Sequence, residues 1–158
     1  MLLRCYAYSR AHLWSRYGIR HLLVFALHHY AIRFGIDISR DVQVGSGFYV
    51  GHFGGIFVDG RVTIGDNCNL SHDVTLGSVN RGAMAGCPSI GNNVYIGPGA
   101  KIIGRIHIGD NVLVGANALV VQDVAPDVTV GGVPARVVSR AGAEDYIHRT
   151  DYPPVPAA

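Results

Sequence analysis

A six-residue repeat constrains the fold of this chain more than any other feature. From Ile90 to Val124 the sequence reads IGNNVY, IGPGAK, IIGRIH, IGDNVL, VGANAL and VVQDV, and an aliphatic residue opens every hexad. The same phase continues towards the N-terminus, with a slip of two residues. The aliphatic anchors are Val44, Val50, Ile56, Ile64, Leu70, Leu76, Ile90, Ile96, Ile102, Ile108, Val114 and Val120. A short fixed period predicts a β-helix, in which coils bury their inner faces by stacking on one another.

The spacing of the hexads also predicts the cross-section of this β-helix. Most anchors are followed by glycine, but Ile103 and Val121 replace this glycine, and these two positions lie eighteen residues apart. Eighteen residues are three hexads, so we expect three hexads in each coil and a triangular prism. With 21 glycines in 158 residues, the chain has roughly twice the usual share of about 7%. Tight corners around an apolar interior account for this composition, and the length is that of one domain.

Residues 1–35 differ in kind from the repeats. They contain no Asp or Glu and carry five arginines. No apolar run approaches the ~18–20 residues that a membrane span needs. We expect one or two helices, broken near Gly18, that form an N-terminal arm capping the end of the β-helix. The alternative is that the basic arm makes peripheral contact with an anionic membrane.

Charge and cysteine content limit the partners and the location. A net charge of +2 argues against nucleic acid as the main partner. Cys5, Cys68 and Cys87 form no C-x-x-C pair. Free thiols of this kind are typical of a reducing compartment, so we expect a cytoplasmic protein.

A histidine at a predicted corner is the first candidate for chemistry. His52 follows the Val50 anchor, and Gly54 and Gly55 come directly after it. A corner places the side chain outside the core, and flanking glycines let a substrate approach the backbone. Imidazole is the usual side chain for accepting a proton near neutral pH.

Several runs of the sequence resemble a known family. The segments GHFGGIFV, IGDNCNLSHDVTLG, IGNNVYIGPGAKIIG and IHIGDNVLVGANALVVQDVAPDVTVGGVPARVV resemble the hexapeptide-repeat acyltransferases, most closely the serine acetyltransferase branch. They are also similar to short polysaccharide acetyltransferases of the colanic-acid type. The resemblance covers residues 36–138, which include an extended loop at 77–89, and leaves 139–158 as a C-terminal tail that we expect to be extended or disordered.

The resemblance implies the handedness of the coil and the chemistry of the site. The fold is expected to be an all-β solenoid, a left-handed parallel β-helix with a short helical arm, although parallel crossovers are usually right-handed. In the family, a histidine at this corner removes the proton of an acceptor hydroxyl, and an aspartate fifteen residues earlier orients it. Asp37 and His52 occupy these positions. The alkoxide then attacks acetyl-CoA, in a site shared between the subunits of a homotrimer.

The acceptor side departs from the pattern of serine acetyltransferases. Serine acetyltransferases typically have an aspartate before the catalytic histidine, which meets the substrate amine, and this chain has Gly51 there. They also have an Arg-His pair that engages the substrate carboxylate, and this chain has Gly86 and Cys87 at those positions. Loss of groups that pair substrate charges favours a neutral hydroxyl acceptor, most simply a sugar. Arg81 is the one charge in the loop, and His72 is expected to line the acceptor pocket. Cys87 as a covalent nucleophile is the less favoured alternative, because no basic residue adjoins it.

The cofactor side follows the family more loosely. The resemblance implies that acetyl-CoA lies along the corners of successive coils. The corresponding corner residues in this chain are Gly77 and Ser78, then Pro98, then Ala116. A cation near the CoA phosphates is common in the family, and Lys101 and Arg136 are the candidates here. Pro98 lacks a backbone donor. No metal is expected.

The predicted function is therefore an acetyl-CoA-dependent O-acetyltransferase acting on a sugar or polysaccharide unit. One alternative is a serine O-acetyltransferase of cysteine biosynthesis, and another is a non-catalytic β-helix with a binding or structural role. A γ-class carbonic anhydrase shares the coil but needs three histidines converging on zinc. His52, His72 and His107 lack the close pair that this site uses.

Overall fold

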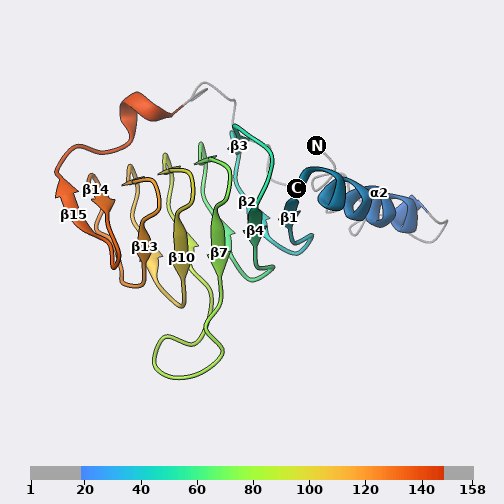
Figure 1. Cartoon of the computed structure of the whole chain (residues 1–158), viewed down its shortest axis with the longest axis horizontal. Coiled ribbons are helices and arrows are strands. Elements are labelled where there is room, and N and C mark those ends of the chain that lie inside the picture. The colour runs from blue at the N-terminus through green and yellow to red at the C-terminus, as the bar shows by residue number, and fades with distance from the viewer. Residues whose placement is uncertain (1–18, 148–158) are drawn as a thin grey trace.

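The computed structural model describes residues 19–147, which form a parallel β-helix with one helix at its N-terminal end (Figure 1). The strands of successive coils assemble into three sheets. The five-stranded sheet holds β1 (Ile36–Ile38), β4 (Ile56–Val58), β7 (Thr75–Gly77), β10 (Lys101–Ile103) and β13 (Leu119–Val120). The four-stranded sheet holds β2 (Gln43–Val44), β5 (Thr63–Ile64), β8 (Ser89–Ile90) and β11 (His107–Ile108). The six-stranded sheet holds β3 (Tyr49–Val50), β6 (Asn69–Leu70), β9 (Tyr95–Ile96), β12 (Leu113–Val114), β14 (Thr129–Gly131) and β15 (Arg136–Ser139).

The aliphatic anchors form the core, as the repeat predicts. Every anchor from Ile56 to Val120 is buried, whereas Val44 and Val50, near the N-terminal end, are only partly buried. Because each coil pairs in register with the next, the anchors stack along the prism, for example Leu70 on Ile96. A second buried row comes from residues two positions before the anchors, including Val62, Cys68, Val74, Val94 and Val112.

The corner between the second and third sheets explains two features of the repeat. A Cβ added at Gly65 would lie 2.6 Å from the Gly91 carbonyl oxygen of the next coil, so a side chain has no room there. The polar residue after each glycine links the coils: Asp66 N donates to Asn92 Oδ1 at 2.8 Å, and Asn92 N donates to Asp110 Oδ1 at 2.6 Å. Backbone donors at these turns therefore find side-chain partners in the next coil.

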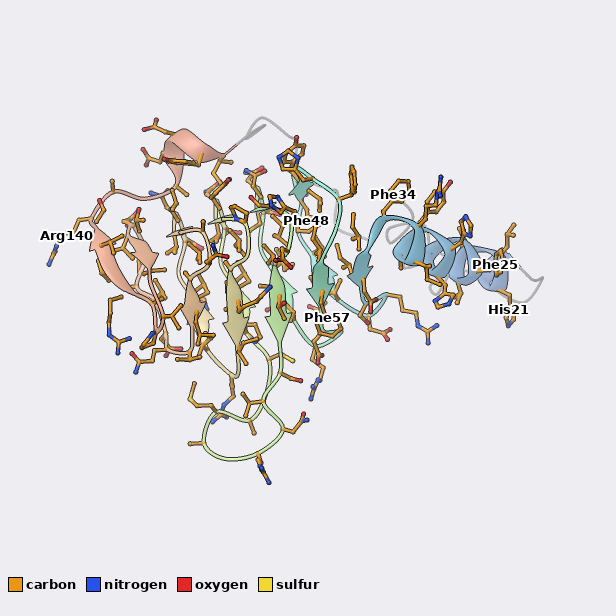
Figure 2. All side chains as sticks on the ribbon, in the orientation of Figure 1. His21, Phe25, Phe34, Phe48, Phe57 and Arg140 are labelled. Atoms are coloured by element: carbon orange, nitrogen blue, oxygen red, sulfur yellow. The ribbon has the colours of Figure 1, made fainter. Side chains whose placement is uncertain are left out.

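The helix α2 (Ile19–Phe34) ends where Gly35 adopts a left-handed conformation with φ 62°, the usual stop signal of a helix. Its last turn meets the solenoid, because the Phe34 ring lies edge-on to Phe53 with centroids 6.4 Å apart. Further along α2, Leu22, Phe25 and Ile32 are each about two-thirds or more exposed. Figure 2 shows Phe25 at the end of the helix that lies away from the solenoid.

Among the described residues of the arm, the C-terminal turn of α2 therefore makes the ring contact with the β-helix. Residues 1–18 lie outside the described part, and so does the break expected near Gly18. No helix among the described residues is long and apolar enough to cross a membrane.

The chain after β14 returns along the solenoid, which the sequence did not predict. Strand β15 pairs antiparallel with β14, and a 3₁₀ turn, η2 (Glu144–Tyr146), follows. Ala143 is fully buried, and its N–H donates to Asn111 Oδ1 at 2.9 Å. The expectation that everything beyond Ser139 is extended or disordered is wrong for this stretch. Contacts with the coils, rather than any periodicity of its own, order it.

The stacking of the anchors predicts a large cost for truncating one of them. Ile102→Ala removes a side chain with no exposed surface in the middle of the prism and should lower the free energy of unfolding by about 2–5 kcal/mol. Ile32→Ala is the matched control, because Ile32 is 72% exposed and its loss should change stability by no more than about 0.5 kcal/mol. Denaturant unfolding measures both, and equal losses would contradict this core.

Candidate active site

The polar candidates lie on two different edges of the triangular prism. The histidine edge comprises the corners that lead from the third sheet to the first, at residues 51–55, 71–74, 97–100 and 115–118. The loop edge comprises the corners that follow β1, β4 and β7, at residues 39–42, 59–62 and 78–88. Strands of the first sheet separate the two edges.

His52 and His72 lie together on the histidine edge. The register pairs Val50 with Leu70, so the two histidines occupy the same place in consecutive coils. Their rings meet edge to face with centroids 5.6 Å apart, and both side chains are exposed. The structure therefore brings together the predicted general base and one predicted acceptor residue, in a position open to a substrate.

Asp37 is not joined to His52 in the described structure. No hydrogen bond or ion pair links the two side chains within residues 19–147. Asp37 projects outwards from β1 opposite Phe57 of β4, and both residues line a cavity of about 990 Å³ beneath α2. The role of Asp37 in orienting His52 stays a prediction, and the geometry of this single chain does not supply the contact.

A compact turn follows His52. Gly54 and Gly55 both have positive φ, and a Cβ added at Gly55 would lie 2.6 Å from Asp73 Oδ1 in the next coil. Lys101 projects from β10 onto the same edge, where its ammonium lies 3.6 Å from Asp73 Oδ1 and donates to the Asp73 carbonyl. The pair is exposed and adds little to stability, but it places one cation near the histidines.

Pro98 and Ala116 continue the row of His52 and His72. Backbone bonds tie these corners together: Gly99 N donates to the His72 carbonyl at 3.1 Å, and Asn117 N donates to the Pro98 carbonyl at 2.9 Å. The two predicted cofactor corners are thus aligned with the predicted base. Gly51 lies at the start of the same edge and is partly buried.

Ser78 does not belong to this row, and neither does the preceding Gly77 at the end of β7. Ser78 follows β7 and therefore lies on the loop edge. The expected alignment of Ser78 with Pro98 and Ala116 is wrong because the loop lengthens its coil. Leu76 pairs with Ile102 in the coil that contains the loop, and Ile102 pairs with Val120 in the coil after it. The coil with the loop is therefore the longer of the two.

The remaining predicted residues are spread over the surface. Arg81 is exposed on the loop, which projects away from the prism (Figure 1). Arg136 is exposed on β15, and its guanidinium donates to the Ala135 carbonyl at 2.8 Å. The two loop ends are held together by backbone bonds between Val79 and Gly86.

The structure places a charged cluster on the loop edge that the sequence analysis missed. Arg61 Nε donates to Asp59 Oδ1 and Arg61 Nη2 to Asp59 Oδ2, both at 3.1 Å. Ser78 and Cys87, at the two ends of the loop, lie beside this pair. The Arg61 guanidinium holds the pKa of Asp59 well below its usual range, with smaller contributions from Cys87 and Ser78. The signal in the sequence was the D-G-R corner one coil below the loop.

Neither described cysteine has the environment of a nucleophile. Burial raises the pKa of the Cys68 thiol to about 12. Burial, followed by the Asp59 carboxylate, also raises the pKa of Cys87, although Arg61 opposes the shift. Within residues 19–147, no three histidine, cysteine or acidic side chains are grouped in a way that would hold a metal ion.

Comparisons with known proteins agree with this fold. Residues 87–122 match the family described as bacterial transferase hexapeptide (six repeats). A serine acetyltransferase of Synechococcus elongatus is 38% identical over 108 residues, 68% of this chain and 44% of the relative. The Escherichia coli serine acetyltransferase is 34% identical over 139 residues, 87% of this chain and 50% of the relative.

A crystal structure of a Brucella abortus serine acetyltransferase in complex with coenzyme A superposes with a TM-score of 0.76 and 30% identity. The match covers 89% of this chain and 54% of that one. A serine acetyltransferase in complex with cysteine gives a TM-score of 0.72 at 31% identity, over 87% of this chain and 55% of that one. The chain spans about half the length of the relatives it matches.

The raised thiol pKa values predict slow alkylation. At pH 7.5 the thiolate fractions of Cys68 and Cys87 should be smaller than that of an ordinary cysteine, whose pKa is about 8.5, so iodoacetamide should label Cys87 slowly and Cys68 only after unfolding. Peptide mass spectrometry over a time course measures both, with glutathione as the reference thiol. Labelling of Cys87 faster than glutathione would revive the covalent mechanism.

Proposed function

We propose that this chain, whose solenoid belongs to the bacterial hexapeptide-repeat transferases, transfers the acetyl group of acetyl-CoA to the hydroxyl of a small acceptor. The observation that carries the proposal is the exposed position of His52 against His72, in line with Pro98 and Ala116. The serine acetyltransferase relatives, one of them with coenzyme A, support the same reaction class.

His52 acts as the general base in this proposal. One ring nitrogen accepts the proton of the acceptor hydroxyl while the hydroxyl oxygen attacks the thioester carbonyl carbon of acetyl-CoA. The tetrahedral intermediate then collapses, its C–S bond breaks, and the imidazolium returns the proton to the departing CoA thiolate. No acyl-enzyme forms, which agrees with the raised pKa of the Cys87 thiol.

The comparisons favour serine over a sugar as the acceptor. The sugar was inferred from the missing charges at Gly51, Gly86 and Cys87, but the relatives are serine acetyltransferases and one is in complex with cysteine. Moreover, the Asp59–Arg61 pair beside Cys87 supplies charges close to where the sequence analysis found none. We therefore propose a serine-type hydroxyl acceptor, ahead of a glycan.

Other partners and the location remain proposals of the same kind. A homotrimer with shared sites is inferred from the family. Cytoplasmic location and peripheral contact of the arm with a membrane stay predictions from composition, the latter supported by the exposed Leu22, Phe25 and Ile32 on a segment without acidic residues.

Removal of the base tests the reaction. His52→Ala should lower the turnover of thiol release from acetyl-CoA by at least about 10²-fold, because general base catalysis typically contributes that much. Binding of CoA, measured by calorimetry, should persist. The matched control is His107→Ala, which truncates a histidine that lies beside Ser89 on the second sheet, and it should release thiol at the wild-type rate.

The assay uses L-serine and, separately, neutral sugars as acceptors. Wild-type turnover by His52→Ala would remove His52 from the mechanism. Release with sugars but not with L-serine would restore the glycan acceptor, and no release by the wild type with any acceptor would favour a non-catalytic binding protein.

A further inference from the structure

Three hydrogen bonds hold the Asp59–Arg61 pair together. Arg61 binds Asp59 through two parallel N–H···O bonds, and its own backbone N–H donates to Asp59 Oδ1 at 3.1 Å. The Asp59 side chain is 19% exposed, whereas that of Arg61 is 64% exposed. Asp59 therefore anchors the guanidinium, which faces the solvent.

The guanidinium keeps donors for a second anion. The fork with Asp59 occupies two of its five N–H groups. A planar guanidinium fixed along one edge presents its other donors in the geometry that suits a carboxylate, and such charge-assisted bonds are the stronger class. Because Asp59 already holds the side chain, less rotamer freedom is lost when a ligand binds.

The position of the pair connects it to the loop. Ser78 and Cys87, where the loop leaves and rejoins the prism, both lie close enough to Asp59 to lower its pKa. Loops inserted into a regular scaffold commonly carry the binding residues. A cluster of ionisable groups with shifted pKa values at such a place is a candidate functional site.

A side chain at position 86, where the serine acetyltransferase branch implies an arginine, would be crowded and strained. A Cβ at Gly86 would lie 3.0 Å from the Arg105 Cβ, and the φ of Gly86 is 132°. Arg105 is engaged in holding the loop, because its Nη2 donates to the Ala83 carbonyl at 3.1 Å. The charge near the end of the loop therefore comes from Arg61, in the coil below.

One chain cannot bring Arg61 and His52 onto the same small acceptor. They lie beyond opposite ends of β4, whose three residues span about 10 Å, and the loop projects away from the prism (Figure 1). The hydroxyl oxygen and carboxylate carbon of serine are only three bonds apart, roughly 4 Å. An acceptor shared by the two residues would therefore require the loop edge of one copy to meet the histidine edge of another.

We propose that Arg61, fixed by its bidentate pair with Asp59, binds the carboxylate of a hydroxy amino acid whose hydroxyl meets His52 of a second copy. This inference rests on the proposed acetyl transfer and names the acceptor class of that site. In this inference Arg61, which lies outside the loop, distinguishes a zwitterionic acceptor from a neutral one.

Two acceptors that differ only in the carboxylate test the assignment. Arg61→Ala should raise the KM for L-serine at least about tenfold and leave the KM for L-serine amide and for acetyl-CoA unchanged. Arg61→Lys should fall between wild type and Arg61→Ala, because an ammonium binds a carboxylate as a point charge. Arg140→Ala is the matched control, since Arg140 lies at the end of the solenoid opposite α2 (Figure 2).

Activity of Arg61→Ala with L-serine amide shows that the variant is folded. An unchanged KM for L-serine in Arg61→Ala, with wild-type activity present, overturns the inference and leaves the proposed function intact. If the wild type releases no thiol with either acceptor, the proposed function fails. Calorimetric titration of L-serine and its amide, with CoA present, then decides the inference. Serine binding that is lost in Arg61→Ala supports it, and equal binding by the two proteins overturns it.

Discussion

The in-register backbone ladder between coils is the constraint on which the rest of this structure depends. Each coil donates to and accepts from its neighbours, for example Gly97 N to the Val114 carbonyl at 2.8 Å, so residues at equivalent corners are held in rows. As a consequence, the aliphatic anchors stack inside the prism, and the side chains at equivalent corners stack in rows on its outside. His52, His72, Pro98 and Ala116 form one such row without any direct contact needing to hold them together.

Much of the fold follows from the hexads, because their period is local and uninterrupted. The anchors, the three sheets and the loop at 77–89 were all predictable from the spacing of Ile, Val, Leu and Gly. Handedness was not, since general rules favour the opposite hand, and it came from the resemblance. The ordered return of residues 141–146 was also hidden, because its partners, such as Asn111 and Tyr95, are far away in the sequence.

The site was predicted less completely, for a reason of the same kind. Residues in one corner could be identified, as with His52, but alignment between corners requires the length of each coil. The loop changes that length, so Ser78 was placed on the wrong edge and the proximity of Asp59 and Arg61 to Cys87 was not seen. The missing charges at Gly86 and Cys87 then suggested a neutral acceptor, whereas the structure places a guanidinium in the coil below.

The proposed site is assembled from two edges that one chain holds apart. His52 on the histidine edge is the proposed base, and Arg61 on the loop edge is the proposed anion-binding residue. A mixture of two variants tests this claim most directly. His52→Ala and Arg61→Ala chains are unfolded and refolded together, light scattering establishes the assembly, and thiol release is measured at L-serine concentrations below the wild-type KM. A shared site predicts recovery of activity above the sum of the two separate variants, because some interfaces pair an intact His52 with an intact Arg61. Activity equal to that sum, or a chain that stays monomeric, would contradict it.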